Sequence, residues 1–274
     1  MLFRSQAALE RCREGIDFCE RRGNTELALA IAAMSTTFLA ESGQAEQALA
    51  EAEPLAERLQ AAGDIVFTEP RSVQLRLLAE RGAHEQAPAA DGLVAAARES
   101  GEPPDYAVAF AATSRLLLAQ GRPQEVQALL SELEQVAGIR AEPYYASLLS
   151  ELVRSALALP EPELATRFVD GVEPTTPLQK HALATCRPQL AEAADEQSEA
   201  ARLYAQAAQR WRDFGNVPER AYALLGQGRC LTALGEPEAE EPLREAHKLF
   251  ASMGYQPALA ETEALLGESE AAAV

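Results

Sequence analysis

The chain has 274 residues, of which 47% are hydrophobic and only 5% aromatic, and its formal net charge is −18 from 42 acidic and 24 basic residues. Such an acidic surplus excludes bulk electrostatic attraction to nucleic acid or to an anionic membrane. Ala and Leu dominate the apolar residues, which favours packed helices over strands. The four cysteines form no CxxC pair. We therefore expect free thiols in a reducing compartment, and a cytoplasmic protein without metal or cofactor.

Helical spacing of apolar residues predicts a lone first helix and then a series of helix pairs. The lone helix, at about 2–22, corresponds to the second helix of a pair without its first, which indicates either that the chain is a piece of something longer or that this helix needs a partner surface. The predicted pairs are 25–42 with 45–62, 65–81 with 85–100, 103–120 with 123–137, 143–159 with 163–169, 178–193 with 196–214, and 218–234 with 238–253, followed by a helix at 256–266. Residues 171–177 are a predicted irregular loop or hinge, and residues 267–274 a flexible tail.

The turns between paired helices recur at a fixed interval. Gly43, Gly82, Gly121 and Pro160 follow one another at steps of 39 residues. A constant period of this size is typical of a helical repeat array, in which each hairpin buries its apolar face by stacking on its neighbours. The sequence thus predicts an all-α fold: one domain over residues 1–266, built as a right-handed superhelical solenoid of antiparallel helix hairpins.

The sixth pair supports a likeness to tetratricopeptide repeats. Counted back from the turn at Gly235, the run 221–235 resembles the first helix of that repeat, with Gly228 at the motif's small position. The spacing of 39 residues exceeds the roughly 34 of the standard unit. The resemblance is therefore to the longer, degenerate repeats of large signalling proteins.

Three further runs carry a more specific resemblance. GIDFCERRG at 15–23, RSVQLRLLAERG at 71–82 and RDFGNVPERA at 212–221 are similar to the C-terminal repeat region of bacterial class III adenylate or guanylate cyclases and of LuxR-type ATP-dependent regulators. The resemblance implies the regulatory or scaffolding end of such a protein. The chain has no GxxxxGK[ST] loop and no strand-flanked pair of carboxylates, so cyclase or ATPase activity is not expected of it.

One set of charged residues repeats with the array. Arg76, Arg115, Arg154 and Arg229 each stand six residues before a turn. In tetratricopeptide arrays the matching position lies on the concave inner face, where peptides bind. A row of guanidinium forks suits carboxylate or phosphate groups on an extended partner. The residues expected to contact a partner are Ser72, Arg76, Tyr106, Arg115, Tyr145, Ser150, Arg154, Tyr222 and Arg229.

The same arginines have a second interpretation. They could form ion pairs with Glu41, Glu80, Glu192 or another glutamate on an adjacent helix and so hold neighbouring helices together. The binding hypothesis predicts that Arg115→Glu combined with Arg154→Glu abolishes partner binding while the helical melting curve survives. Residue spacing alone leaves both interpretations open.

The remaining chemistry-bearing residues favour packing over catalysis. Phe110, Tyr144 and Trp211 are predicted core residues. The histidines are far apart in sequence and are expected at the surface or at helix ends. No nucleophile can be paired with a base. We therefore expect a non-catalytic interaction or regulatory domain that binds a protein, a peptide, possibly acidic in character, or neighbouring domains of a parent protein. The alternative hypothesis is a sensor with a small-molecule effector between its inner helices.

Overall fold

The computed structural model describes residues 5–272, a range that contains helices and turns but no strand. The all-α class predicted from the sequence is therefore confirmed. The α-helices are α1 (Ser5–Arg21), α2 (Thr25–Glu41), α3 (Ala45–Ala61), α4 (Thr68–Glu80), α5 (Asp91–Ser100), α6 (Pro103–Ala119), α7 (Pro123–Gln135), α8 (Pro143–Leu157), α9 (Glu163–Val169), α10 (Pro177–Ala193), α11 (Gln197–Phe214), α12 (Val217–Ala233), α13 (Glu240–Met253) and α14 (Gln256–Ala272).

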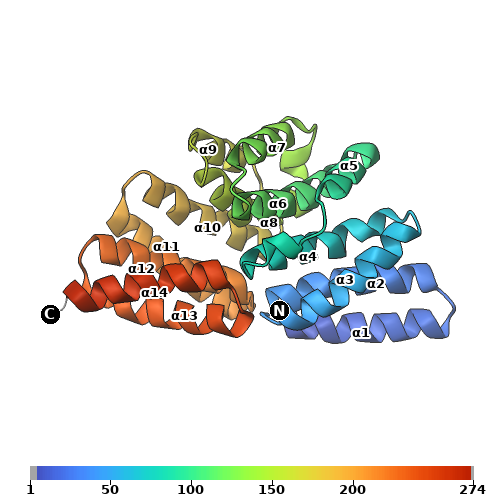
Figure 1. Ribbon diagram of the computed structural model, residues 1–274, viewed down its shortest axis with the longest axis horizontal. Coiled ribbons are helices and arrows are strands. Elements are labelled where there is room, and N and C mark those ends of the chain that lie inside the picture. The colour runs from blue at the N-terminus through green and yellow to red at the C-terminus, as the bar shows by residue number, and fades with distance from the viewer. Residues whose placement is uncertain (1–4, 273–274) are drawn as a thin grey trace.

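The helices pack in two layers. Most of them contact the next helix in the chain, and the even-numbered helices also contact one another, α2 with α4, α4 with α6, α6 with α8, α8 with α10 and α12 with α14. The odd-numbered helices cover the outside of this series (Figure 1). We use the term inner face for the surface of the even-numbered helices that carries Arg76, Arg115, Arg154 and Tyr222.

The two ends of the helical series meet. Helix α12 contacts α2, and α14 contacts α4, although these helices are far apart in sequence. Leu39 and Val73 belong to the same buried apolar cluster as Leu224 and Tyr255. In Figure 1 the N-terminal hairpin accordingly lies beside the C-terminal helices. The inner face is thus enclosed by the chain rather than open along one side.

Glycine makes the turns possible. Gly43, Gly82 and Gly121 have φ angles of 81°, 69° and 69°, in the left-handed region where a side chain is strained. At Gly43 there is a second requirement, because an added Cβ would lie 3.0 Å from Cγ1 of Val217 on α12. The glycine at this turn therefore also permits the close approach of the first and last hairpins.

Two predicted boundaries were wrong. The helix predicted over 85–100 begins only at Asp91, after a short 3-10 turn at His84–Gln86, because Pro88 can neither donate a backbone hydrogen bond nor continue the helix. At the other end, α14 continues to Ala272 instead of ending at residue 266. The predicted tail is therefore helical as far as Ala272, and residues 273–274 lie outside the described residues.

The predicted loop at 171–177 is irregular up to Thr176, whose hydroxyl and backbone form a reciprocal cap with Gln179 at the start of α10. Two glutamines connect α10 to α8. Gln179 Nε2 donates to the carbonyl of Pro143 at 3.2 Å, and Gln189 Nε2 donates to that of Ser150 at 3.1 Å. The loop therefore leads into a helix that is hydrogen-bonded to α8.

Candidate functional site: the inner face

The four arginines singled out in the sequence all form ion pairs with glutamates of other helices. Arg76 Nη1 lies 3.1 Å from Glu151, Arg154 Nη2 lies 2.8 Å from Glu219, and Arg115 donates to Glu80. Arg229 donates to Glu192 and, at 2.6 Å, to Glu261. These are the ion pairs between helices expected under the second interpretation, and two of the glutamates it named, Glu80 and Glu192, are among the partners.

Glu80 is the centre of this network. It accepts hydrogen bonds from Arg115 Nε at 3.0 Å and from the hydroxyl of Tyr222, which is distant in sequence. The guanidinium of Arg154 lies 4.0 Å from the centre of the Tyr222 ring, within the range of a cation–π contact. Helices α4, α6, α8 and α12 are thereby joined through charged and aromatic groups at the point where the ends of the chain meet.

Burial shapes the ionisation of these groups. Burial and the neighbouring carboxylate of Glu80 raise the pKa of Tyr222 well above its ordinary value, so its hydroxyl stays protonated and remains a donor. For Arg115, burial opposes the charged form, but Glu80, Tyr222 and Glu151 together outweigh it and raise the pKa. Tyr222 and Arg115 therefore both remain hydrogen-bond donors in this network near neutral pH.

Carboxylates outnumber guanidinium groups on this face. Glu41 lines a cavity on the inner face, together with Arg76 and Glu219. None of the described side chains forms a hydrogen bond or an ion pair with Glu41. Burial and the nearby Glu69 and Glu219 raise its pKa to about 7, against the opposing effect of Arg76. Glu69 accepts only the hydroxyl of Thr37, at 2.7 Å. The inner face therefore has two carboxyl groups, Glu41 and Glu69, without an ion-pair partner among the described residues.

Several other predicted contact residues take no part in this network. Tyr145 is only 1% exposed and donates from its hydroxyl to the carbonyl of Phe168 at 2.9 Å. Ser72 and Ser150 are buried, although Ser150 lines the same cavity as Arg76 and Glu80. Tyr106 is half-buried with its ring 5.1 Å from that of Phe110. None of these four side chains forms part of the charged network.

The two adjacent tyrosines of α8 exchange their expected roles. Tyr144, predicted to pack in the core, is 44% exposed, whereas Tyr145 is buried. One residue along a helix turns the side chain by about 100°, so a small error in the assumed helix orientation reverses the assignment. The predictions for Phe110 and Trp211 were correct, since both are buried.

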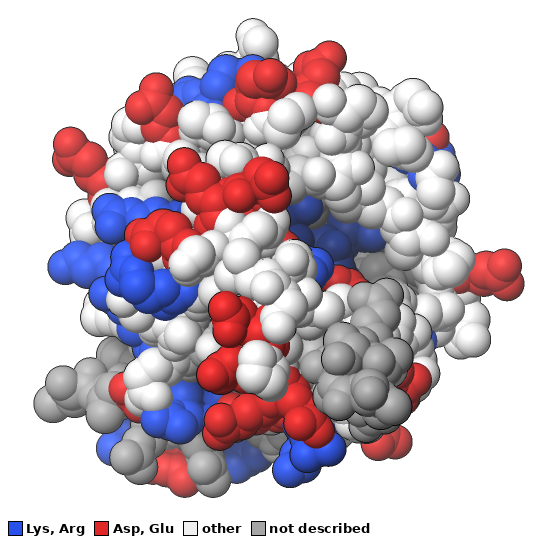
Figure 2. Space-filling model, turned by 90° about the vertical axis from the view of Figure 1, so that its left-hand side faces the viewer, with Lys and Arg blue, Asp and Glu red and all other residues white. Residues whose placement is uncertain are grey.

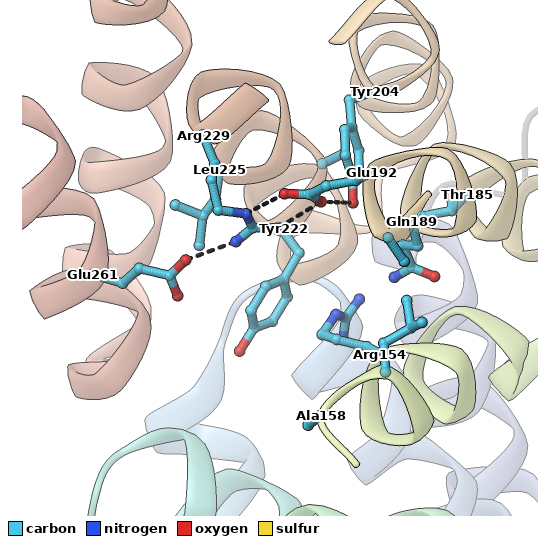
Figure 3. A pocket seen from close by; sticks show the side chains of 13 residues that line it. Arg154, Ala158, Thr185, Gln189, Glu192, Tyr204, Tyr222, Leu225, Arg229 and Glu261 are labelled. Carbon is cyan, nitrogen blue, oxygen red and sulfur yellow. Dashed lines mark hydrogen bonds and ion pairs between the residues drawn. The ribbon is translucent and has the colours of Figure 1, made fainter. Parts of the chain in front are cut away.

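A hollow opens on the inner face beside the network. It has a volume of about 330 Å³ and is lined by side chains that include Arg154, Gln189, Glu192, Tyr222 and Arg229. Glu192 accepts from Arg229 at 2.9 Å and from Tyr204 at 2.7 Å, so these groups hold one another in place (Figure 3). Figure 2 views the molecule from its C-terminal side and shows a recess with basic side chains in its depth.

The oxygen of one buried amide in this hollow has no partner. Gln189 is 6% exposed, and its Oε1 accepts no hydrogen bond although its Nε2 is bonded. Such an acceptor is costly to bury and is usually matched by a donor. Gln189 Oε1 is therefore an unused acceptor buried in the wall of the hollow.

Two of the cysteines lie beside this face, Cys186 near Arg154 and Cys230 near Glu192. All four cysteines are buried and free, and burial raises the pKa of Cys230 to about 12, so it is not a thiolate nucleophile. His181, predicted to be at the surface or at a helix end, is half-buried against Trp211 and Phe214. His247 pairs with Glu263 at 3.2 Å.

Within residues 5–272, no group of three or more His, Cys, Asp or Glu side chains has the geometry to hold a metal ion. Over the same range, no helix is both long and apolar enough to cross a bilayer.

Two glutamates of the network, Glu151 and Glu219, were not predicted from the sequence. Glu151 and Glu219 carry no repeat signature of their own, but Glu151 lies one helical turn before Arg154 and so shares its face. A search for acidic residues one turn from each arginine would have found it.

Comparison with protein-family models and with curated proteins finds no match for this chain.

Proposed function

We propose that this chain is a non-catalytic protein-interaction scaffold whose inner face is the working surface. In this proposal the hairpins form a right-handed, tetratricopeptide-like solenoid with a period of about 39 residues. It would be the C-terminal regulatory part of a larger ATP-dependent signalling protein, a cyclase or a transcriptional regulator, as the resemblance implies. The enzymatic activity would belong to other domains of that protein.

The observation that carries this proposal is the position of the charged network. Glu80 binds groups of α6 and α12 at once, so a partner that competes for Glu80 or Arg115 would alter the contact between the two ends of the chain. Binding to the inner face would in this way change the curvature of the helical series. A scaffold can transmit such a change to neighbouring domains without performing any chemistry.

Affinity capture with a matched pair of variants tests the proposal. Arg229→Gln removes a half-exposed inner-face cation paired with Glu192, and Arg202→Gln removes an exposed cation paired with Glu199. We expect a protein captured by the wild type and by Arg202→Gln to be lost with Arg229→Gln. Recovery of an ATP-binding or cyclase protein would support the family proposal. Equal capture by both variants would rule out the inner face as the working surface.

A small-molecule effector site is the second candidate, favoured by the unused Gln189 acceptor in the 330 Å³ hollow. A thermal-shift screen with sugars, nucleotides and other metabolites tests it, because a ligand at about a hundred times its Kd stabilises the fold by about 2.7 kcal/mol. A shift that disappears in Gln189→Leu supports this candidate. A shift that persists in the variant places the ligand elsewhere.

A further inference from the structure

A second hollow lies between the middle of α2 and the N-terminal ends of α4, α6 and α8. It has a volume of about 350 Å³, and its lining includes Met34, Ile65, Val108 and Tyr144. Of the six large hydrophobic side chains that are exposed in the described part of the chain, Met34, Ile65 and Tyr144 lie here, at 39%, 42% and 44% exposure. Exposed apolar side chains gathered in one hollow are typical of an interaction site.

The hollow follows the same repeat spacing as the arginines. Val66, Asp105 and Tyr144 stand 39 residues apart, as do Ala30, Glu69 and Val108. Equivalent positions of successive hairpins therefore line one continuous surface, on which apolar side chains alternate with Glu69 and Asp105. An elongated segment could contact all four helices at once.

The charge of the hollow is acidic. Glu69 and Asp105 line it, and neither forms an ion pair with a described lysine or arginine. Burial raises the pKa of Glu69 and the nearby Asp105 raises it further, against the opposing effects of the Thr37 hydroxyl and of Arg76, which itself pairs with Glu151. A positive group placed here would relieve that repulsion, whereas an acidic group would increase it.

We infer that this hollow docks an apolar segment of another protein that carries a lysine or arginine, its large side chains packing against Met34 and Tyr144 and its cation lying between Glu69 and Asp105. The inference rests on the proposed scaffold function and names the chemistry of the partner. It also reverses the expectation of an acidic partner. The arginines on which that expectation was based are already neutralised by glutamates of the chain itself.

Phage display tests this inference. A library of random peptides about 12 residues long is selected for binding to the complete chain. We expect the enriched peptides to combine large apolar residues with lysine or arginine. Met34→Asp and Tyr144→Ala should each weaken a selected peptide at least about tenfold. Leu234→Asp is the matched control, since Leu234 is an equally exposed leucine on another part of the surface, and it should change binding by no more than about twofold.

The contrary outcomes are distinct. Enrichment of acidic peptides, or binding that survives both Met34→Asp and Tyr144→Ala, overturns this inference and leaves the scaffold function standing. Failure to enrich any peptide counts against both. A wild-type dimer in sedimentation velocity that Met34→Asp dissociates would show that a second copy occupies the hollow instead. Thermal melting of each variant confirms that a loss of binding is not a loss of fold.

Discussion

Replacing Arg115 by methionine should destabilise the protein strongly, because it leaves a buried carboxylate without its cation. The side chains of Arg115 and Glu80 are only 18% and 7% exposed, and Glu80 would keep just one of its two donors, the hydroxyl of Tyr222. Breaking a buried pair by removing one partner costs about 3–5 kcal/mol. Since Arg115 retains some contact with water, we expect a loss of about 3 kcal/mol in the free energy of unfolding.

Urea denaturation followed by circular dichroism measures this loss, with Arg122→Met as the control. Arg122 pairs with Glu125 within one helix, and both side chains are about half-exposed. Its replacement should cost only about 0.3–0.5 kcal/mol. The double variant Arg115→Met with Glu80→Leu should regain part of the lost stability, because no unpaired charge remains. A loss for Arg115→Met no larger than that for Arg122→Met would refute the view that this network holds the ends of the chain together.

Two further predictions concern close packing and pH. Gly226→Ala should destabilise the protein by about 1–3 kcal/mol, because the new Cβ would lie 2.5 Å from the Tyr204 ring. Gly92→Ala, inside a helix with no such clash, should stabilise it by about 0.5–1 kcal/mol; thermal denaturation compares the two. The pKa of Glu41 is raised from 4.5 to about 7 in the folded chain, so the folded state holds the proton more tightly and stability should fall as pH rises from 5 to 8. Glu41→Gln should reduce that fall by an amount on the order of 2 kcal/mol in urea titrations at each pH, and an unchanged slope would contradict it.

The structure also changes the expected outcome of a charge reversal. If the arginines were free on an open surface, Arg115→Glu with Arg154→Glu would leave the melting curve intact. Each of them instead lies against a glutamate with little exposure. Reversal would place carboxylates beside Glu80 and Glu219, so we expect the double variant to unfold at much lower temperature. Half-exposed Arg229 is the better residue for testing binding.

The sequence by itself determined the local structure of this protein. Helical spacing of apolar residues located the helices, and glycines at fixed intervals located the turns, because both depend on residues only a few positions apart. The same local geometry put Arg76, Arg115 and Arg154 on one face, since residues at equivalent places in similar hairpins point the same way. The break at Pro88 was the main local failure, although the proline itself signalled it.

Only the tertiary structure decided what those arginines meet. Tyr222 reaches Glu80 across 142 residues, and Arg154 reaches Glu219 across 65. These contacts depend on how all the intervening helices pack, which brings α12 and α14 against α2 and α4. No single hairpin determines that packing. The choice between Tyr144 and Tyr145 as the buried ring failed for a related reason, because it depends on the exact rotation of α8 against its neighbours.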